Sequence, residues 1–107
     1  MKSVDQKTLD EIVRRILSVT SPDRIILFGS AATGKMSEDS DIDLLIVKSD
    51  IADRRQEYMR IRRALRDLEF PFDIILITTQ WFEESKNVVG GIAHPADKQG
   101  RVLYAAA

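Results

Sequence analysis

The feature that most constrains the fold is an uninterrupted apolar run, Leu-Leu-Ile-Val at residues 44–47, inside an extended segment over 42–48. A strand that is apolar on both faces is typical of a central strand covered on both sides. Further β-branched and aromatic strands are expected over residues 24–28 and 72–78. A helix is expected over residues 52–68, between the strands at 42–48 and 72–78. This order of strand, helix and strand predicts that these two strands are parallel and joined by a right-handed crossover.

The rest of the chain completes an α/β pattern around one small mixed sheet. An amphipathic helix is expected over residues 4–18, where Ser3 and Gln6 fit a capping box. A short helical turn and a loop follow the first strand. The expected segments are the turn at 30–33, the loop at 34–40, short helices near 81–84 and 95–98, and an extended piece at 101–104. We expect a single domain over residues 1–107.

Composition excludes several classes of protein. The chain is 44% hydrophobic and 31% charged, which suits a globular protein with one core and argues against a disordered chain or a membrane span. The absence of cysteine excludes a disulfide scaffold and a Cys-ligated zinc site. A formal net charge of −1 gives no general reason to expect nucleic acid or a membrane surface. The first residues lack the apolar segment of a signal peptide, so a cytoplasmic location is expected.

Three aspartates open the apolar strands. Asp41 and Asp43 are two residues apart on an extended chain, so their side chains leave the same face about 6–7 Å apart. Neighbouring carboxylates repel and aspartate is a poor strand residue, so the pair is costly for folding but suited to a divalent cation such as Mg²⁺. Asp73 opens the parallel strand at 72–78 in the same way. All three carboxylates should therefore lie at one end of the sheet.

A glycine and a serine should reach the same place. Gly29 ends the first strand and Ser30 begins the helical turn, and antiparallel pairing with the strand at 42–48 would bring both to the carboxylates. Glycine allows close approach of a ligand to the backbone, and the N–H groups of a helical turn suit a phosphate. Two cations at such a site could clamp the attacking and leaving oxygens at phosphorus. The sequence predicts phosphoryl or nucleotidyl transfer.

These residues resemble a known signature. Gly29-Ser30, then Asp-Ile-Asp-Leu at 41–44 and a later strand aspartate, resemble the DNA polymerase β-like nucleotidyltransferase superfamily. The element order and the ending at residues 100–104 are similar to its minimal nucleotidyltransferase (MNT) branch. The resemblance implies the polymerase β-like fold, Mg²⁺ as a two-ion site and ATP as substrate. Members of this branch are often antitoxins encoded beside a helical HEPN ribonuclease toxin, and some silence it by transferring AMP to a tyrosine.

The resemblance also implies roles for individual residues. Gly29 and Ser30 would hold the triphosphate, and Asp41 and Asp43 would bind both metals. Asp73 would complete one metal site and help to deprotonate the attacking hydroxyl. The implied partner is a HEPN-type toxin in a hetero-oligomer, with neither a membrane nor direct nucleic-acid contact expected.

Several interpretations stay open. A non-catalytic binding module that neutralises the toxin by complex formation would have the same sequence features, whereas a small-molecule nucleotidyltransferase of the aminoglycoside-modifying kind is disfavoured. Lys35 could contact a phosphate or be a solvated loop residue, and His94 is expected at the surface or in packing. The arginines within residues 52–68 are interpreted as a solvated, salt-bridged face, because Glu57 and Asp67 lie among them.

Overall fold

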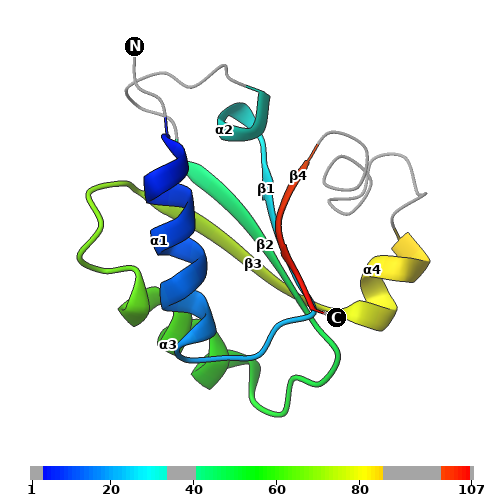
Figure 1. Ribbon diagram of the computed structural model, residues 1–107. Helices are drawn as coiled ribbons and strands as arrows, with labels where there is room; N and C mark the ends of the chain where they lie inside the picture. The colour runs from blue at the N-terminus through cyan, green and yellow to red at the C-terminus, as the bar shows by residue number, and fades with distance from the viewer. Residues whose placement is uncertain (1–3, 34–40, 86–99, 107) are drawn as a thin grey trace.

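The computed structural model describes residues 4–33, 41–85 and 100–106. Figure 1 shows the elements in chain order: α1 (Gln6–Leu17), β1 (Arg24–Phe28), α2 (Ser30–Thr33), β2 (Ile42–Lys48), α3 (Arg54–Ala64), β3 (Phe72–Thr78), α4 (Thr79–Ser85) and β4 (Arg101–Ala105). The bounds of the first three strands are those predicted. The loop expected at 34–40 and the short helix expected near 95–98 lie outside the described residues.

Two helices, α1 and α3, are shorter than predicted. Asp5 has an extended backbone, and its side chain accepts a hydrogen bond from the Thr8 N–H at 2.8 Å. The N-cap of α1 is therefore Asp5, and the predicted capping box at Ser3 and Gln6 is wrong. α3 is shorter than residues 52–68, because Asp53 caps its start and the chain leaves helical geometry at Leu65.

The four strands form one mixed sheet in the order β3-β2-β1-β4. β2 pairs with β3 in parallel, and β1 pairs antiparallel with β2, both as the sequence predicts. β4 adds to β1 antiparallel, with an irregularity between Ile25 and Ile26. The two edge strands of the sheet are thus β3 and β4.

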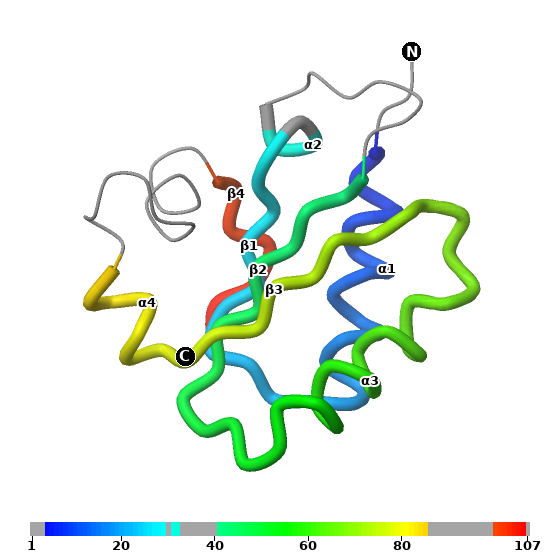
Figure 2. Tube along the Cα trace, turned by 180° about the vertical axis from the view of Figure 1, so that it is seen from behind, coloured from blue at the N-terminus to red at the C-terminus, as the bar shows by residue number. Residues whose placement is uncertain are grey.

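The sheet divides the core into two layers. Figures 1 and 2 show α1 and α3 on one face and α4 on the other. The larger layer joins α1 and α3 to the sheet and contains Leu9, Ile12, Ile16, Ile25, Leu27, Ile42, Leu44, Ile46, Ile61, Leu65, Ile74 and Leu76. The smaller layer, on the α4 face, contains Ile26, Phe28, Leu45, Val47, Ile77 and Phe82. The doubly apolar run at 44–47 therefore reflects burial on both faces.

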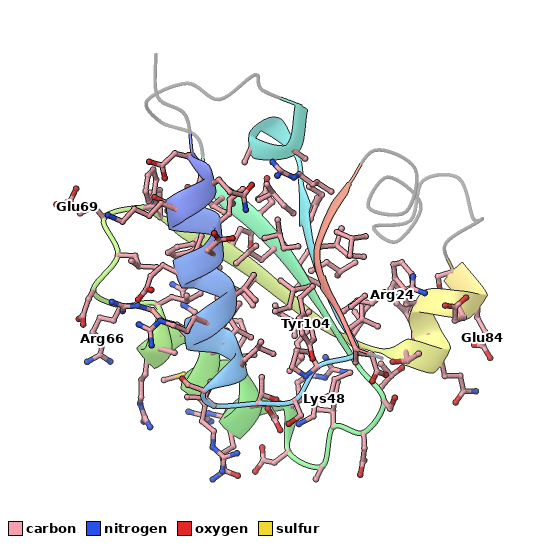
Figure 3. All side chains as sticks on the ribbon, viewed as in Figure 1. Arg24, Lys48, Arg66, Glu69, Glu84 and Tyr104 are labelled. Carbon is pink, nitrogen blue, oxygen red and sulfur yellow. The ribbon has the colours of Figure 1, made fainter. Side chains whose placement is uncertain are left out.

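Polar contacts fix the strand ends that lie away from the aspartates. Lys48 Nζ lies 2.5 Å from Glu57 Oε1 on α3, and the Thr20 hydroxyl donates to Glu57 Oε2 at 2.9 Å. Figure 3 labels Lys48 at this end of β2. Nearby, the hydroxyls of Ser49 and Thr79 donate to the carboxylate of Asp23. Among the helices of the described segments, none has the length and apolar character needed to cross a bilayer.

Candidate active site

The strand register brings the predicted segments together. Asp43 on β2 is the register partner of Asp73 on β3, and Phe28, the last residue of β1, is the register partner of Asp43. Ile42 and Leu44, on either side of Asp43, belong to the layer under α1 and α3. The side chains of Asp43 and Asp73 therefore leave the opposite face, because side chains alternate along a strand.

The three carboxylates act on one another. Burial raises the pKa of Asp43 above its ordinary value, and the charges of Asp73 and Asp41 and a side-chain hydrogen bond with Asp73 raise it further. Asp43 is half-buried, whereas Asp41 and Asp73 are exposed. Negative charge is thus concentrated around one partly desolvated carboxylate, an arrangement that a cation would relieve.

Gly29 lies against this carboxylate. Its φ of 70° is in the left-handed region, and a Cβ at this position would come within 2.2 Å of Asp43 Oδ2. Glycine is therefore required twice, once for the backbone angle and once for the space that Asp43 occupies. The chain then turns directly into α2, where Ala32 N–H donates to the Gly29 carbonyl at 3.2 Å.

α2 is held in place by apolar contacts. Ala31 and Ala32 pack against the larger core layer. The alanines that follow the Gly-Ser pair thus anchor the short helix to the sheet. Ser30 begins α2, as predicted, but its side chain is outside the described set. Lys35 and His94 also lie outside the described residues.

The donor set can be compared with the needs of a divalent cation. Within residues 4–33, 41–85 and 100–106, no three metal-ligating side chains are grouped closely enough to hold a metal ion by themselves. Asp43 and Asp73 are nevertheless neighbouring carboxylates, and Mg²⁺ is usually bound by one or two carboxylates together with substrate phosphates. The residues fit a cation that is held jointly with a nucleotide.

The arginines of α3 do not form the expected salt-bridged face. Glu57 pairs with Lys48 of β2. Asp67 lies 3.7 Å from Arg15 of α1. Both acidic residues thus form their ion pairs outside α3. The expected exposure of the arginines is confirmed, but the expected salt bridges among them are wrong.

A comparison with known families agrees with the fold. Residues 10–106 match the family described as Polymerase beta, Nucleotidyltransferase. The chain belongs to this family. The predicted polymerase β-like fold is confirmed.

Solved structures share this fold at low sequence identity. A toxin–antitoxin crystallised with AMP-PNP matches with a TM-score of 0.71 and 19% identity, over 92% of this chain and 73% of that one. A complex of a tri-AMPylated Shewanella oneidensis HEPN toxin with an MNT antitoxin matches with a TM-score of 0.65 and 17% identity, over 94% of this chain and 72% of that one. No curated protein sequence matches significantly.

Proposed function

We propose that this nucleotidyltransferase-family chain is an Mg²⁺-dependent antitoxin that transfers AMP from ATP to a tyrosine hydroxyl of a cognate HEPN toxin and thereby neutralises it. The observation that carries the proposal is the pair of carboxylates on β2 and β3, with Asp43 directly against the positive-φ glycine that leads into α2. Relatives of the same fold support it, because one was crystallised with AMP-PNP and another contains an AMPylated HEPN toxin beside an MNT antitoxin.

Each of the candidate site residues would have a distinct role in the transfer. Gly29 and Ser30 would receive the triphosphate, and Asp41, Asp43 and Asp73 would hold Mg²⁺ together with it. When bound, Mg²⁺ supplies positive charge that offsets the charge of the phosphates and of the leaving group. Asp73 is exposed and so accessible to an acceptor hydroxyl, whose proton it would accept.

The AMP transfer needs no reactant other than ATP and the toxin's hydroxyl group. The toxin's hydroxyl oxygen forms a bond to the α-phosphorus of ATP. The bond from that phosphorus to the oxygen between the α- and β-phosphates breaks. AMP is then esterified to the toxin, pyrophosphate leaves with the electron pair of the broken bond, and the hydroxyl proton passes to the carboxylate.

A labelling experiment tests this function. The chain is incubated with ATP labelled at the α-phosphate, Mg²⁺ and the product of the adjacent gene, which the proposal expects to be a HEPN protein, and label on that product is measured. We expect label with the wild type and a loss of at least 100-fold with Asp43→Asn. Asp50→Asn is the matched control, because Asp50 is an exposed aspartate outside the site and should transfer normally. Equal labelling by Asp43→Asn would contradict the proposed role of this carboxylate.

A second candidate function is a binding module that neutralises the toxin without catalysis. It is favoured by one observation, that no three metal-ligating side chains of the described segments are grouped to hold an ion. In that case the same mixture would give a tight complex, no label, and toxin inhibition that Asp43→Asn leaves intact.

A further inference from the structure

The arginines of the α3 region fall into two groups. Six arginines occupy residues 54–66, against three acidic residues in the longer stretch 53–67. Two of the six, Arg54 and Arg62, donate hydrogen bonds to backbone carbonyls of β3. In the described part of the chain, no ion pair involves the other four, Arg55, Arg60, Arg63 and Arg66.

The first group has a structural role. β3 is an edge strand, so its outward carbonyls have no neighbouring strand to bond to. Arg54 donates to the Leu76 carbonyl, and Arg62 donates to the Phe72 carbonyl at 2.7 Å. The two arginines are eight residues apart on a helix, about 12 Å, and the two carbonyls are four residues apart on a strand, about 13 Å. Because these two lengths agree, both hydrogen bonds can form at once, and together they hold α3 along the edge strand β3.

A pocket lies between α3 and the beginning of β3. Its volume is about 520 Å³, and Leu65, Leu68, Phe70, Phe72 and Ile74 supply its apolar lining. Its charged lining consists of Arg62, Arg63 and Arg66. Figure 3 shows Arg66 at the periphery of the molecule, directed away from the sheet. We call this feature the arginine-rimmed pocket.

The composition of the pocket points to a protein rather than a nucleic acid. Arginine, methionine and aromatic residues are enriched in the cores of protein interfaces, and Met59, which is 40% exposed, also lines the pocket. Single-stranded nucleic acid stacks its bases on exposed aromatic faces. The three aromatic side chains of the lining, Tyr58, Phe70 and Phe72, are partly buried rather than exposed, and the guanidinium of Arg62 lies 5.8 Å from the centre of the Tyr58 ring.

We propose that the arginine-rimmed pocket docks an acidic segment of the partner protein, with one aliphatic or aromatic side chain inserted between the arginines. Charge complementarity supports this occupant: the chain as a whole carries a formal charge of −1, yet Arg62, Arg63 and Arg66 line this pocket with no acidic residue beside them in the lining. Glu57 and Asp67, the nearest acids in the sequence after Asp53, form their ion pairs with Lys48 and Arg15. The proposal rests on the proposed function, since the partner is the HEPN toxin of that function.

The position of the pocket gives the contact a consequence. Phe72 and Ile74 line the pocket and flank Asp73 in β3, while the Asp73 side chain leaves the other face of the sheet. A partner bound at the pocket would therefore contact β3, the edge strand that carries Asp73. Docking there would place the partner beside the end of the sheet where the transfer is proposed.

Binding of the chain to the product of the adjacent gene, the partner that the proposed function expects, tests the docking surface. Affinity is measured by titration calorimetry for the wild type, Arg63→Glu, Arg66→Glu and Lys7→Glu. Lys7 is the matched control, because it is an exposed cation on α1 and its reversal changes the net charge equally. We expect each arginine reversal to weaken binding at least ten-fold in 50 mM salt and less in 500 mM salt, while Lys7→Glu changes it less than two-fold. Circular dichroism verifies that each variant is folded.

The outcomes separate the two proposals. If the wild type binds and both arginine reversals bind equally well, the docking proposal is overturned and the proposed function stands. If the wild type forms no complex, the proposed function fails and the docking proposal fails with it. A fluorescent 20-nucleotide RNA is titrated in parallel. RNA binding that Arg66→Glu abolishes, with toxin binding unchanged, would overturn the docking proposal in favour of a nucleic-acid surface.

Discussion

Replacing Gly29 with alanine tests the geometry at the centre of the candidate site. The φ of 70° costs an alanine about 1–2 kcal/mol. The new methyl group would also meet Asp43 Oδ2 at 2.2 Å, so the carboxylate must rotate away from its rotamer, at about 0.5–1.5 kcal/mol. We expect Gly29→Ala to lower the free energy of unfolding by about 1.5–3.5 kcal/mol, where about 1 kcal/mol already corresponds to several degrees in Tm.

A double-mutant cycle separates the two contributions. Unfolding in urea at pH 7 is measured for the wild type, Gly29→Ala, Asp43→Ala and the double variant. Removal of the Asp43 carboxylate leaves its Cβ 3.5 Å from the new methyl group, an ordinary contact. The cost of Gly29→Ala should therefore fall by about 0.5–1.5 kcal/mol in the Asp43→Ala background, leaving the backbone contribution alone.

Gly29→Asn provides a second check, because asparagine tolerates positive φ but still carries a Cβ. It should cost less than Gly29→Ala in the wild-type background and retain the coupling to Asp43. An unchanged cost of Gly29→Ala when Asp43 is truncated would refute the reasoning, since the carboxylate would then not lie against this glycine.

Three further outcomes are expected. In the absence of Mg²⁺, Asp43→Asn should raise the free energy of unfolding by about 1 kcal/mol in thermal melts, because it removes like-charge repulsion from a partly buried carboxylate. Lys48→Met should cost about 2 kcal/mol in urea unfolding, because it leaves the largely buried carboxylate of Glu57 without its cation; Glu57→Gln in the same chain should recover part of the loss. Hydrogen bonds to Asp23 and Glu57 lower the pKa of both carboxyls, so their stabilisation is present above their unfolded pKa values near 4 and is lost as pH falls through the lower folded values. Tm should therefore drop below about pH 4, and less steeply in Asp23→Asn than in the wild type.

The strands and the convergence of the site residues could be predicted because they depend on short-range patterns. The apolar runs fix where the strands begin, and a helix of moderate length between two of them allows only a parallel crossover. Asp43 and Asp73 follow the first residue of β2 and β3 in the same phase, so parallel pairing makes them neighbours. The bend at Gly29 reaches them because β1 runs antiparallel to β2.

The arginine contacts of α3 could not be predicted in this way. Charge spacing along a helix gives pairs within that helix, and it favoured partners for the arginines on α3 itself. Which side of α3 faces the edge of β3 depends on tertiary packing, and packing sends Glu57 to Lys48 and Arg62 to the Phe72 carbonyl. The prediction of the N-cap of α1 was wrong for a related reason. Aspartate and serine are both good N-cap residues, so residue type alone does not distinguish Asp5 from Ser3.

The location of the carboxylates explains how the fold tolerates them. Asp43 lies on a central strand whose neighbours Ile42, Leu44 and Leu45 have no exposed surface. Their burial contributes several kcal/mol, more than the repulsion between two adjacent aspartates removes. A loop could relieve that repulsion by moving its charges apart, whereas hydrogen bonding of β2 to both β1 and β3 holds the register pair in place. The repulsion among the carboxylates is therefore retained in the folded protein, where the proposed cation would relieve it on binding.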